Sequence, residues 1–258
     1  MKWLNYLLFF CVITVNSQDS ISVIKQRQSP LDVSQIIGID NFGTEYFLKN
    51  NIFYKKTTDN TINYSNVQLG NLTTVNTFNP LKLVLFYKDF NTVIILDNRL
   101  AEVYKIDFNS TQPYKNITHV SIGNDNTIWT FNQDLQQLQL YDYKAKLVRA
   151  TTLPVVSNVL DLTSNYNYCW LLTENYLYKY SYFGSLLFKI ENKGFSKLSE
   201  SNDNIILNQG NALFYLDDKT QKITPVKTPE LLINQFLVTA ETLYIYDSKI
   251  LHEFQLKN

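Results

Sequence analysis

Residues 79–106 read NPLKLVLFYKDFNTVIILDNRLAEVYKI, and the fold can be argued outward from this stretch. Its apolar residues form three short runs, Leu81–Tyr87, Thr92–Leu96 and Leu100–Ile106, separated by turns at Lys88–Asn91 and Asp97–Arg99. The runs are rich in β-branched and aromatic side chains, which favour strands over helices. The first two runs are apolar at successive positions, a pattern typical of strands that are covered on both faces. The stretch therefore predicts a sheet stacked between other sheets.

The middle run of this stretch recurs along the chain. Each copy is a five-residue run, and the copies are Ile52–Lys56, Val93–Asp97, Leu138–Asp142, Leu177–Ser181, Leu213–Asp217 and Leu243–Asp247. A repeat of about 40 residues with about four strands per unit indicates a β-propeller. A Tyr- and Leu-rich β protein could produce such matches by chance, but copies in register, each followed by a turn and another strand, favour the repeat. We predict an all-β fold, a single β-propeller of about six four-stranded blades, with seven possible.

The start of the chain differs from the rest. Residues 1–18 have a positive start at Lys2 and an apolar core at Leu4–Val15, as a secretory signal peptide does. Residues 19–32 are expected to form an N-terminal strand (Ile21–Ile24) and a polar linker (Gln26–Pro30), and residues 33–258 the propeller domain. Two closures of the ring are open: Ile250–Leu256 completes the last unit by itself, or Ile21–Ile24 pairs into its sheet.

Charge and cysteine content exclude several classes of protein. Lys plus Arg and Asp plus Glu each number 23, so no basic face predicts nucleic-acid binding. Behind the signal peptide only Cys169 remains, which excludes an intramolecular disulfide. Cys169 lies in the apolar run at 168–172, where a buried structural thiol is expected rather than a reactive one.

The sequence offers few groups for catalysis or metal binding. His119 and His252 lie in expected strands without a His or Cys partner at metal-binding spacing, so we expect both on solvated strand faces. Glycines are scattered singly, which argues against a phosphate-binding loop. Four aspartates are each expected to close the third strand of a unit: Asp97, Asp142, Asp217 and Asp247. We expect them to form turns, in which the side chain caps the chain reversal. The alternative is that they form a ring of carboxylates.

A propeller glycosidase would need paired carboxylates near the axis. Runs expected to lie inside the ring, such as Leu83–Tyr87 and Asn204–Leu207, do not obviously present such a pair. We therefore expect a protein that is not an enzyme, with no cofactor, no metal and no small-molecule substrate.

Residues 79–102, NPLKLVLFYKDFNTVIILDNRLAE, resemble a family of exported propeller-like proteins of Bacteroidota, the plug subunits of the type IX secretion translocon. The likeness extends over most of the chain behind the signal peptide but is carried specifically by this segment. It implies a periplasmic, non-enzymatic subunit that plugs the periplasmic mouth of a large outer-membrane barrel without inserting into the membrane itself. The alternatives are a propeller hydrolase acting on carbohydrate and a scaffold propeller with another partner.

The propeller geometry predicts which loops meet a partner. Loops between the second and third strands of a blade emerge on one face, here the first face, together with the loops that lead to the next blade. We expect the partner on this face, at Lys88, Asp89, Phe90 and Asn91, with Phe90 at the tip, because exposed aromatics are enriched in binding hot spots. Phe183 belongs to a loop of the opposite, second face. The alternative is that both rings fold back onto a neighbouring blade.

Overall fold

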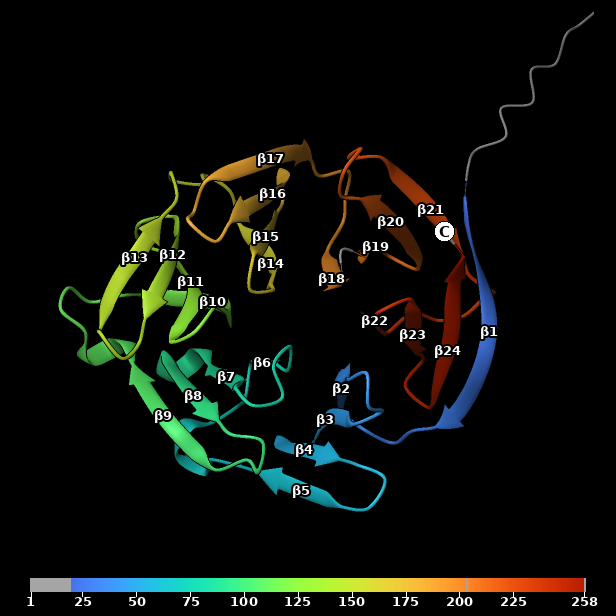
Figure 1. Ribbon diagram of the computed structural model, residues 1–258, viewed down its shortest axis with the longest axis horizontal. Coiled ribbons are helices and arrows are strands. Elements are labelled where there is room, and N and C mark those ends of the chain that lie inside the picture. The colour runs from blue at the N-terminus through green and yellow to red at the C-terminus, as the bar shows by residue number, and fades with distance from the viewer. Residues whose placement is uncertain (1–19, 203, 258) are drawn as a thin grey trace, which may run out of the picture.

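The chain forms a ring of sheets around a central channel, as the computed structural model shows for residues 20–202 and 204–257 (Figure 1). Four sheets have four strands each, and an eight-stranded sheet contains the two remaining blades. The protein is therefore an all-β propeller of six four-stranded blades, as the repeat predicts. The expected signal peptide, residues 1–18, lies outside the described residues.

Each blade has four strands, which we call a to d from the channel outward. The first three blades consist of β2 (Gln35–Ile39), β3 (Glu45–Lys49), β4 (Ile52–Lys56) and β5 (Thr61–Tyr64); β6 (Thr74–Asn76), β7 (Leu83–Tyr87), β8 (Thr92–Leu96) and β9 (Glu102–Asp107); and β10 (Ile117–Ile122), β11 (Thr127–Asn132), β12 (Gln137–Asp142) and β13 (Leu147–Thr151). The fourth and fifth consist of β14 (Val159–Ser164), β15 (Tyr168–Thr173), β16 (Tyr176–Ser181) and β17 (Leu186–Glu191); and β18 (Lys197–Ser201), β19 (Asn204–Gln209), β20 (Ala212–Asp217) and β21 (Ile223–Lys227). The sixth consists of β22 (Gln235–Thr239), β23 (Thr242–Tyr246), β24 (Ile250–Lys257) and β1 (Ile21–Pro30).

Short 3-10 turns lie in three of the connections. They are η1 (Val67–Leu69), η2 (Lys88–Phe90) and η3 (Phe108–Ser110). No helix among residues 20–202 and 204–257 has the length and apolar character needed to cross a membrane.

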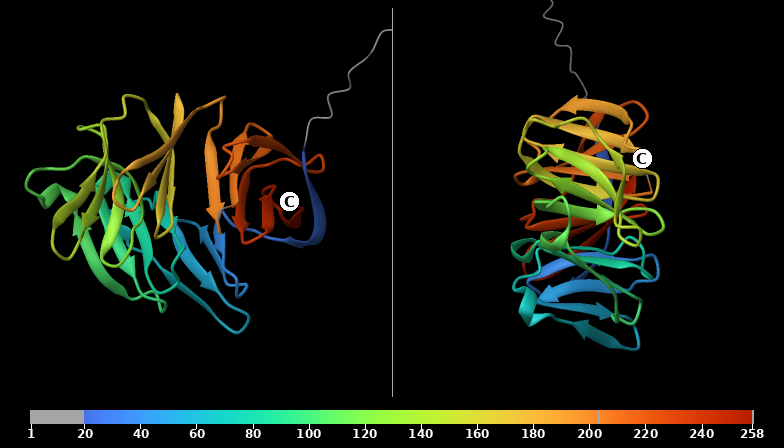
Figure 2. Two further views of the ribbon diagram at one scale, coloured as in Figure 1. Left: turned by 45° about the horizontal axis from the view of Figure 1, so that its top comes forward. Right: turned by 90° about the vertical axis from the view of Figure 1, so that its left-hand side faces the viewer.

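The strands b and c of the second blade show why the apolar runs do not alternate. Every residue of β7 and β8 is buried. Val84 and Phe86 face the third blade, whereas Leu83 and Leu85 face the first blade. Successive side chains of a strand point to opposite faces, so a strand between two neighbours needs apolar residues at every position. Figure 2 shows the blades standing side by side around the ring.

Each interface between neighbouring blades has its own hydrophobic core. Five of these cores contain nine to twelve buried residues. The core between the sixth and first blades is the smallest, with Ile36, Ile39, Leu237, Tyr246 and Leu251. The seam where the ring closes therefore has the least apolar packing.

The N-terminal strand closes the ring. β1 pairs antiparallel with β24, from Ser22 opposite Lys257 to Pro30 opposite Ile250, and parallel with β21 at Ile21 (Figure 1). Strand pairing at the N-terminus was one of the two closures left open by the sequence. The expectation of a linker at Gln26–Pro30 was wrong: this segment is the second half of β1, and it is polar because its side chains lie on the outside of the ring.

This closure shifts the last repeat by one strand. Leu243–Asp247 was expected to be a third strand, like the other copies, but β23 is strand b of its blade. Since β1 supplies strand d, the C-terminal segment needs to provide only three strands.

Candidate functional site

The predicted contact loop lies where the sequence placed it in the fold. η2 connects strands b and c of the second blade, so Lys88, Asp89 and Phe90 stand on the first face. All three are exposed, and Phe90 is 45% exposed. Its ring lies over Gly70 of the preceding inter-blade loop, where an added Cβ would come within 3.2 Å of the ring. Phe90 is thus half packed against its neighbour and half open to a partner.

Asn91, the fourth residue of this loop, has a structural role instead. Its side chain is buried, accepts a hydrogen bond from the Ile117 amide at 3.2 Å and donates one to the Lys115 carbonyl at 2.6 Å. The backbone of Asn91 is left-handed, with φ of 48°, which asparagine tolerates better than most residues. The expectation that all four residues of this loop face a partner therefore fails at Asn91, because its amide joins the second blade to the third.

Two other asparagines make the same clamp. Asn51 accepts from the Leu72 amide at 2.8 Å and donates to the Gly70 carbonyl at 2.9 Å. Asn211 accepts from the Ile233 amide and donates to the Leu231 carbonyl, both at 2.7 Å. Each clamp joins a b–c loop to the backbone that leads into the next blade. Sequence reasoning missed this role, although an asparagine in the b–c turns was a visible signal.

Large apolar side chains are exposed along the first face. Six of them lie on neighbouring loops and are called the apolar arc here; they are Val67, Phe90, Tyr114, Leu135, Leu153 and Val156. Leu232, also exposed, lies apart in the connection between the fifth and sixth blades. Val67, Leu153 and Val156 are 85–91% exposed, so they contribute little to the core. The arc covers the b–c loops of the second and third blades and the three connections that lie before, between and after these blades.

Hydrogen bonds show that these loops are neighbours. Asn109 donates to the Phe90 carbonyl at 2.9 Å, and Asn116 donates to the Asp134 carboxylate at 2.8 Å. The Val155 amide donates to the Gln136 carbonyl at 2.7 Å. The loops of the arc therefore form one continuous surface rather than scattered tips.

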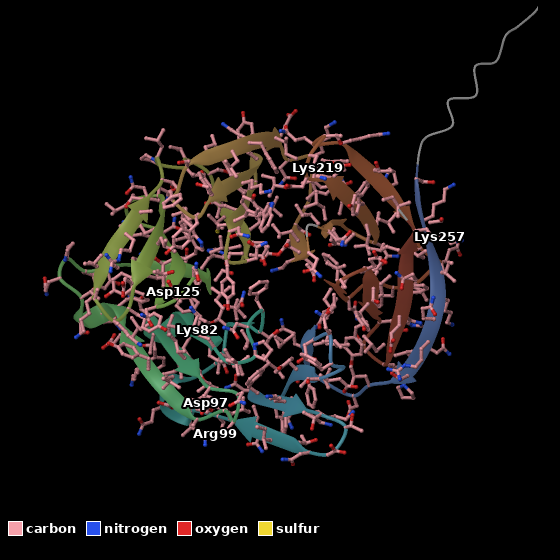
Figure 3. The ribbon with its side chains drawn as sticks, viewed as in Figure 1. Lys82, Asp97, Arg99, Asp125, Lys219 and Lys257 are labelled. Atoms are coloured by element: carbon pink, nitrogen blue, oxygen red, sulfur yellow. The ribbon has the colours of Figure 1, made fainter. Side chains whose placement is uncertain are left out.

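The second face also has exposed apolar residues. Phe183 is 81% exposed in the c–d loop of the fourth blade, as expected from the sequence, and lies edge-on to Tyr182. Phe42, Phe78 and Leu81 belong to the a–b loops of the first two blades. Phe42 and Phe78 line the channel, and the Phe78 ring lies edge-on to Tyr166 of the fourth blade. Lys82 anchors the loop behind Leu81 by donating to three carbonyls of the third blade, those of Gly123, Asp125 and Thr127 (Figure 3).

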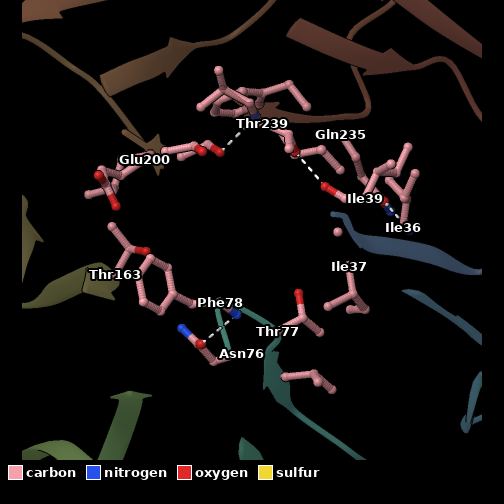
Figure 4. A pocket seen from close by; sticks show the side chains of 18 of the residues that line it. Ile36, Ile37, Ile39, Asn76, Thr77, Phe78, Thr163, Glu200, Gln235 and Thr239 are labelled. Carbon is pink, nitrogen blue, oxygen red and sulfur yellow. Dashed lines mark hydrogen bonds between the residues drawn. The ribbon is translucent and has the colours of Figure 1, made fainter. Parts of the chain in front are cut away.

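A cavity of about 530 Å³ follows the axis of the ring and is lined mainly by strands a (Figure 4). Several of its polar side chains join neighbouring strands a. Gln235 accepts from the Ile36 amide at 2.7 Å, Thr239 donates to the Ile39 carbonyl at 2.6 Å, and Ser199 accepts from the Val238 amide at 3.0 Å. Polar side chains of the channel therefore join neighbouring blades through hydrogen bonds.

Two titratable groups in the channel have displaced pKa values. Burial, with the charges of Lys88 and Lys197, lowers the pKa of His119 to about 4, so this imidazole is neutral at pH 7. Burial also raises the pKa of Asp161, whose oxygens accept from the amides of Leu198 at 2.9 Å and Leu162 at 3.0 Å. His119, Asp161 and Lys197 all line the channel.

The runs expected to lie inside the ring are not its innermost strands. β7 and β19 are strands b, and the channel is lined instead by β6, β14 and β18. These strands bring Asp161 and Glu200 to the channel from adjacent blades, which the sequence reasoning did not foresee. The error arose because the most apolar run of a blade belongs to its buried middle, whereas strand a is half solvated.

The aspartates at strand ends are turn formers, as predicted. Asp97 accepts from the amides of Arg99 and Ala101, both at 2.9 Å, and also pairs with the Arg99 guanidinium (Figure 3). Asp142, Asp217 and Asp247 cap their turns in the same way. Among the described residues, no three His, Cys, Asp or Glu side chains come together as metal ligands would.

Cys169 and His252 are both buried, which agrees with the expectation for the first and not for the second. Cys169 is buried between the third and fourth blades, as expected, and burial raises the pKa of its thiol. His252 was expected on a solvated face, but it is 5% exposed and pairs with Asp247 at 3.0 Å. The expectation failed because His252 shares a face of β24 with Phe254 and Leu256, which pack in the core between the fifth and sixth blades.

Comparison with known proteins supports the fold. No protein-family model matches the chain, and no curated protein matches its sequence. Among solved structures it is similar to a streptogramin B lyase, with a TM-score of 0.64, 12% identity, and 90% of this chain and 88% of that chain covered. It is also similar to virginiamycin B lyase from Staphylococcus aureus (TM-score 0.61, 10% identity, 86% and 80% covered). The WD40 domain of Pan2 from Neurospora crassa gives a TM-score of 0.58, 10% identity, and 88% and 75% covered. At these identities the shared property is the fold: the chain has a β-propeller fold resembling those of the lyases and of WD40 domains.

Proposed function

We propose that the protein is a protein-interaction propeller whose first face binds a protein partner. The observation that carries this proposal is the apolar arc, in which exposed Val, Leu and aromatic side chains stand on loops that are joined by hydrogen bonds. Contiguous apolar surface on a folded protein marks an interaction site more often than isolated exposed residues do. Exposed aromatic and aliphatic anchors supply much of the energy of such interfaces.

The finer proposal is that the partner is a large outer-membrane barrel of the type IX secretion system, and that the protein is periplasmic and plugs the barrel when no substrate is engaged. The resemblance of residues 79–102 supports this assignment. A ring with an apolar arc on one face suits the role, because that face is able to cover an opening while the rest of the protein stays in water.

Affinity capture in mild detergent, from cells that express the tagged protein, tests the proposal. Recovery of a large outer-membrane barrel is expected, with strong loss of recovery for Leu153→Asp. Leu153 is 85% exposed, so this change places a charge in the arc with little effect on folding. A matched change on the second face, Phe42→Asp, should leave recovery unchanged. Equal recovery with both variants would contradict the assignment of the face, and recovery of a different partner would contradict the assignment of the barrel.

The carboxylates of the channel favour one second candidate, a hydrolase acting on carbohydrate. Asp161 and Glu200 line one cavity, and the raised pKa of Asp161 is a property that a general acid needs. The hydrogen bond from the Leu198 amide also gives Asp161 a structural role. Turnover of a glycan that is abolished by Glu200→Gln would favour the hydrolase over the interaction module.

A further inference from the structure

Side-chain hydrogen bonds tie the six blades together where the channel opens on the second face. Strands a run from the first face to the second, so this mouth is formed by their last residues and by the a–b loops. Contacts between neighbouring blades run from the second blade round to the first: Asn76–Ser121 (3.1 Å), Ser121–Ser164 (2.8 Å), Asn165–Glu200 (3.2 Å), Ala240–Ser201 (3.0 Å) and Thr239–Ile39 (2.6 Å). Side chains at this mouth are therefore held in place before a ligand arrives, which lowers the cost of binding.

An aromatic ring and a carboxylate come together at this mouth. Phe78, in the a–b loop of the second blade, lines the channel and is 43% exposed. Its ring lies edge-on to Tyr166 of the fourth blade, with the ring centroids 5.0 Å apart. Tyr166 directly follows Asn165, which donates to Glu200, so successive contacts lead from Phe78 to Glu200 although their blades are not neighbours. Figure 4 shows Phe78 and Glu200 at one opening, on either side of Thr163.

The charges of the channel are divided between its two ends. Asp40, Asp161 and Glu200 line the channel, whereas Lys197 is the one Lys or Arg among the described residues that does so. Lys197 begins β18 at the first-face end, and Glu200 lies near the second-face end of the same strand. Asp40 also lies at the second-face end, where its carboxylate accepts from two amides of its own loop, both at 2.9 Å. The second-face mouth is therefore acidic and suits a cationic group.

We propose that the second-face mouth of the channel binds a guanidinium group on an aliphatic chain, which stacks on Phe78 and pairs with Glu200. A guanidinium group is planar, so it is able to stack on an aromatic ring and to donate two parallel hydrogen bonds to a carboxylate. A carboxylate has about four acceptor positions, so the bond from Asn165 orients Glu200 without excluding a ligand. This inference goes beyond the proposed function, because it assigns a ligand site to the face opposite the apolar arc.

The size and lining of the cavity agree with such a ligand. Its volume of about 530 Å³ lies within the range of about 300–1,000 Å³ that is typical of small-molecule sites. Ile37 and Thr77 of the first two blades line it as well, so apolar and hydroxyl-bearing side chains are available to the aliphatic chain and to further N–H groups (Figure 4).

Titration of the purified, isotope-labelled protein at low salt, followed by nuclear magnetic resonance, tests the inference with defined probes. The probe is butylguanidinium, and its matched control is butylurea, which has the same shape without the charge. We expect butylguanidinium to bind at least about tenfold more tightly, because its hydrogen bonds to a carboxylate are charge-assisted. The capped peptide Gly-Gly-Arg-Gly-Gly presents the same group on a polypeptide. Tighter binding of the peptide would point to an arginine of a protein, and tighter binding of butylguanidinium to a free small molecule.

Variants locate the site. Glu200→Gln keeps the shape and the acceptor for Asn165 and should weaken butylguanidinium binding about tenfold. Phe78→Leu keeps an apolar side chain without the aromatic face and should weaken binding about threefold. The matched controls are Glu174→Gln, which is exposed on the first face, and Phe183→Leu, which is exposed on the second face outside the channel. Neither control should change the affinity.

Equal affinity for butylguanidinium and butylurea, or no binding of either, would overturn the inference, and this comparison needs no variant to fold. Wild-type affinity in Glu200→Gln, or an equal loss in Glu174→Gln, would overturn it as well. Failure of the proposed function is a separate result, because the capture experiment with Leu153→Asp concerns the first face.

Discussion

At the scale of residues, asparagine side chains join neighbouring blades where backbone pairing cannot. The Asn91 amide satisfies one carbonyl and one amide of the next blade, and both would otherwise be buried without partners. We expect Asn91→Ala to lower the free energy of unfolding by about 2 to 4 kcal/mol, since an orphaned buried polar group costs about 1–3 kcal/mol. Urea denaturation measures this change. Asp89→Ala, two residues away and exposed, is the control and should change stability by less than about 0.5 kcal/mol.

His119 predicts how stability depends on pH. Its pKa is about 4 in the folded protein against 6.5 for the unperturbed side chain. Between these values the unfolded chain binds the proton more readily, so the free energy of unfolding falls on acidification from pH 6.5 to pH 4. The steepest contribution is about 1.4 kcal/mol per pH unit. His119→Gln should flatten this part of the profile in urea titrations between pH 4.5 and pH 7. The pKa of Asp247, lowered to about 2 mainly by the hydrogen bond from His252, affects stability below about pH 5 and therefore touches only the acid end of this window.

At the scale of elements, ring closure depends on a strand from the far end of the chain. Tyr246 fixes the connection from β1 to the first blade: its hydroxyl lies 3.0 Å from the Leu31 carbonyl and 3.1 Å from the Val33 carbonyl. Tyr246→Phe should lower the free energy of unfolding by about 1 to 3 kcal/mol, because a buried hydrogen bond is lost at the seam with the smallest core. Tyr244→Phe, on the same strand and without a hydrogen bond to the described residues, is the matched control. Thermal melts of equal midpoint for the two variants would contradict this account of the seam.

The elements also show what sequence patterns predict and what they miss. Runs such as Val93–Leu96 are apolar at every position because two interfaces cover them, and this pattern is visible in the sequence. β1 gave no such signal, since the outermost strand of the ring has exposed polar side chains at Lys25 and Arg27. β1 pairs with β24 because the ring brings the two ends of the chain together. Residues more than 220 positions apart thereby become neighbours, as Arg27 and Glu253 do.

In the candidate site, too, some residues could be predicted from the sequence and others could not. Phe90 was predictable because it interrupts two apolar runs at a tight turn. Leu153 and Val156 were not, because an exposed apolar residue in a loop has the same sequence signature as one that folds into the core. His119 and Asp161 line the same cavity because the ring brings their blades together, and their separation along the sequence does not indicate this.

At the scale of the whole molecule, the two faces of the ring differ in kind. The first face presents the apolar arc on loops that are joined by hydrogen bonds, whereas the exposed apolar residues of the second face lie in the a–b loops of the first two blades and in the c–d loop of the fourth. A protein that covers an opening needs one such face, and the proposed plug would therefore be oriented with its first face toward the barrel.

Photo-crosslinking tests this orientation most directly. A benzophenone amino acid at position 153 replaces a residue of the first face, and the same amino acid at position 42 replaces an equally exposed residue of the second face. We expect irradiation of intact cells to join the protein to an outer-membrane partner from position 153 and not from position 42. A crosslink to that partner from position 42 alone would contradict the central claim that the first face is the binding surface.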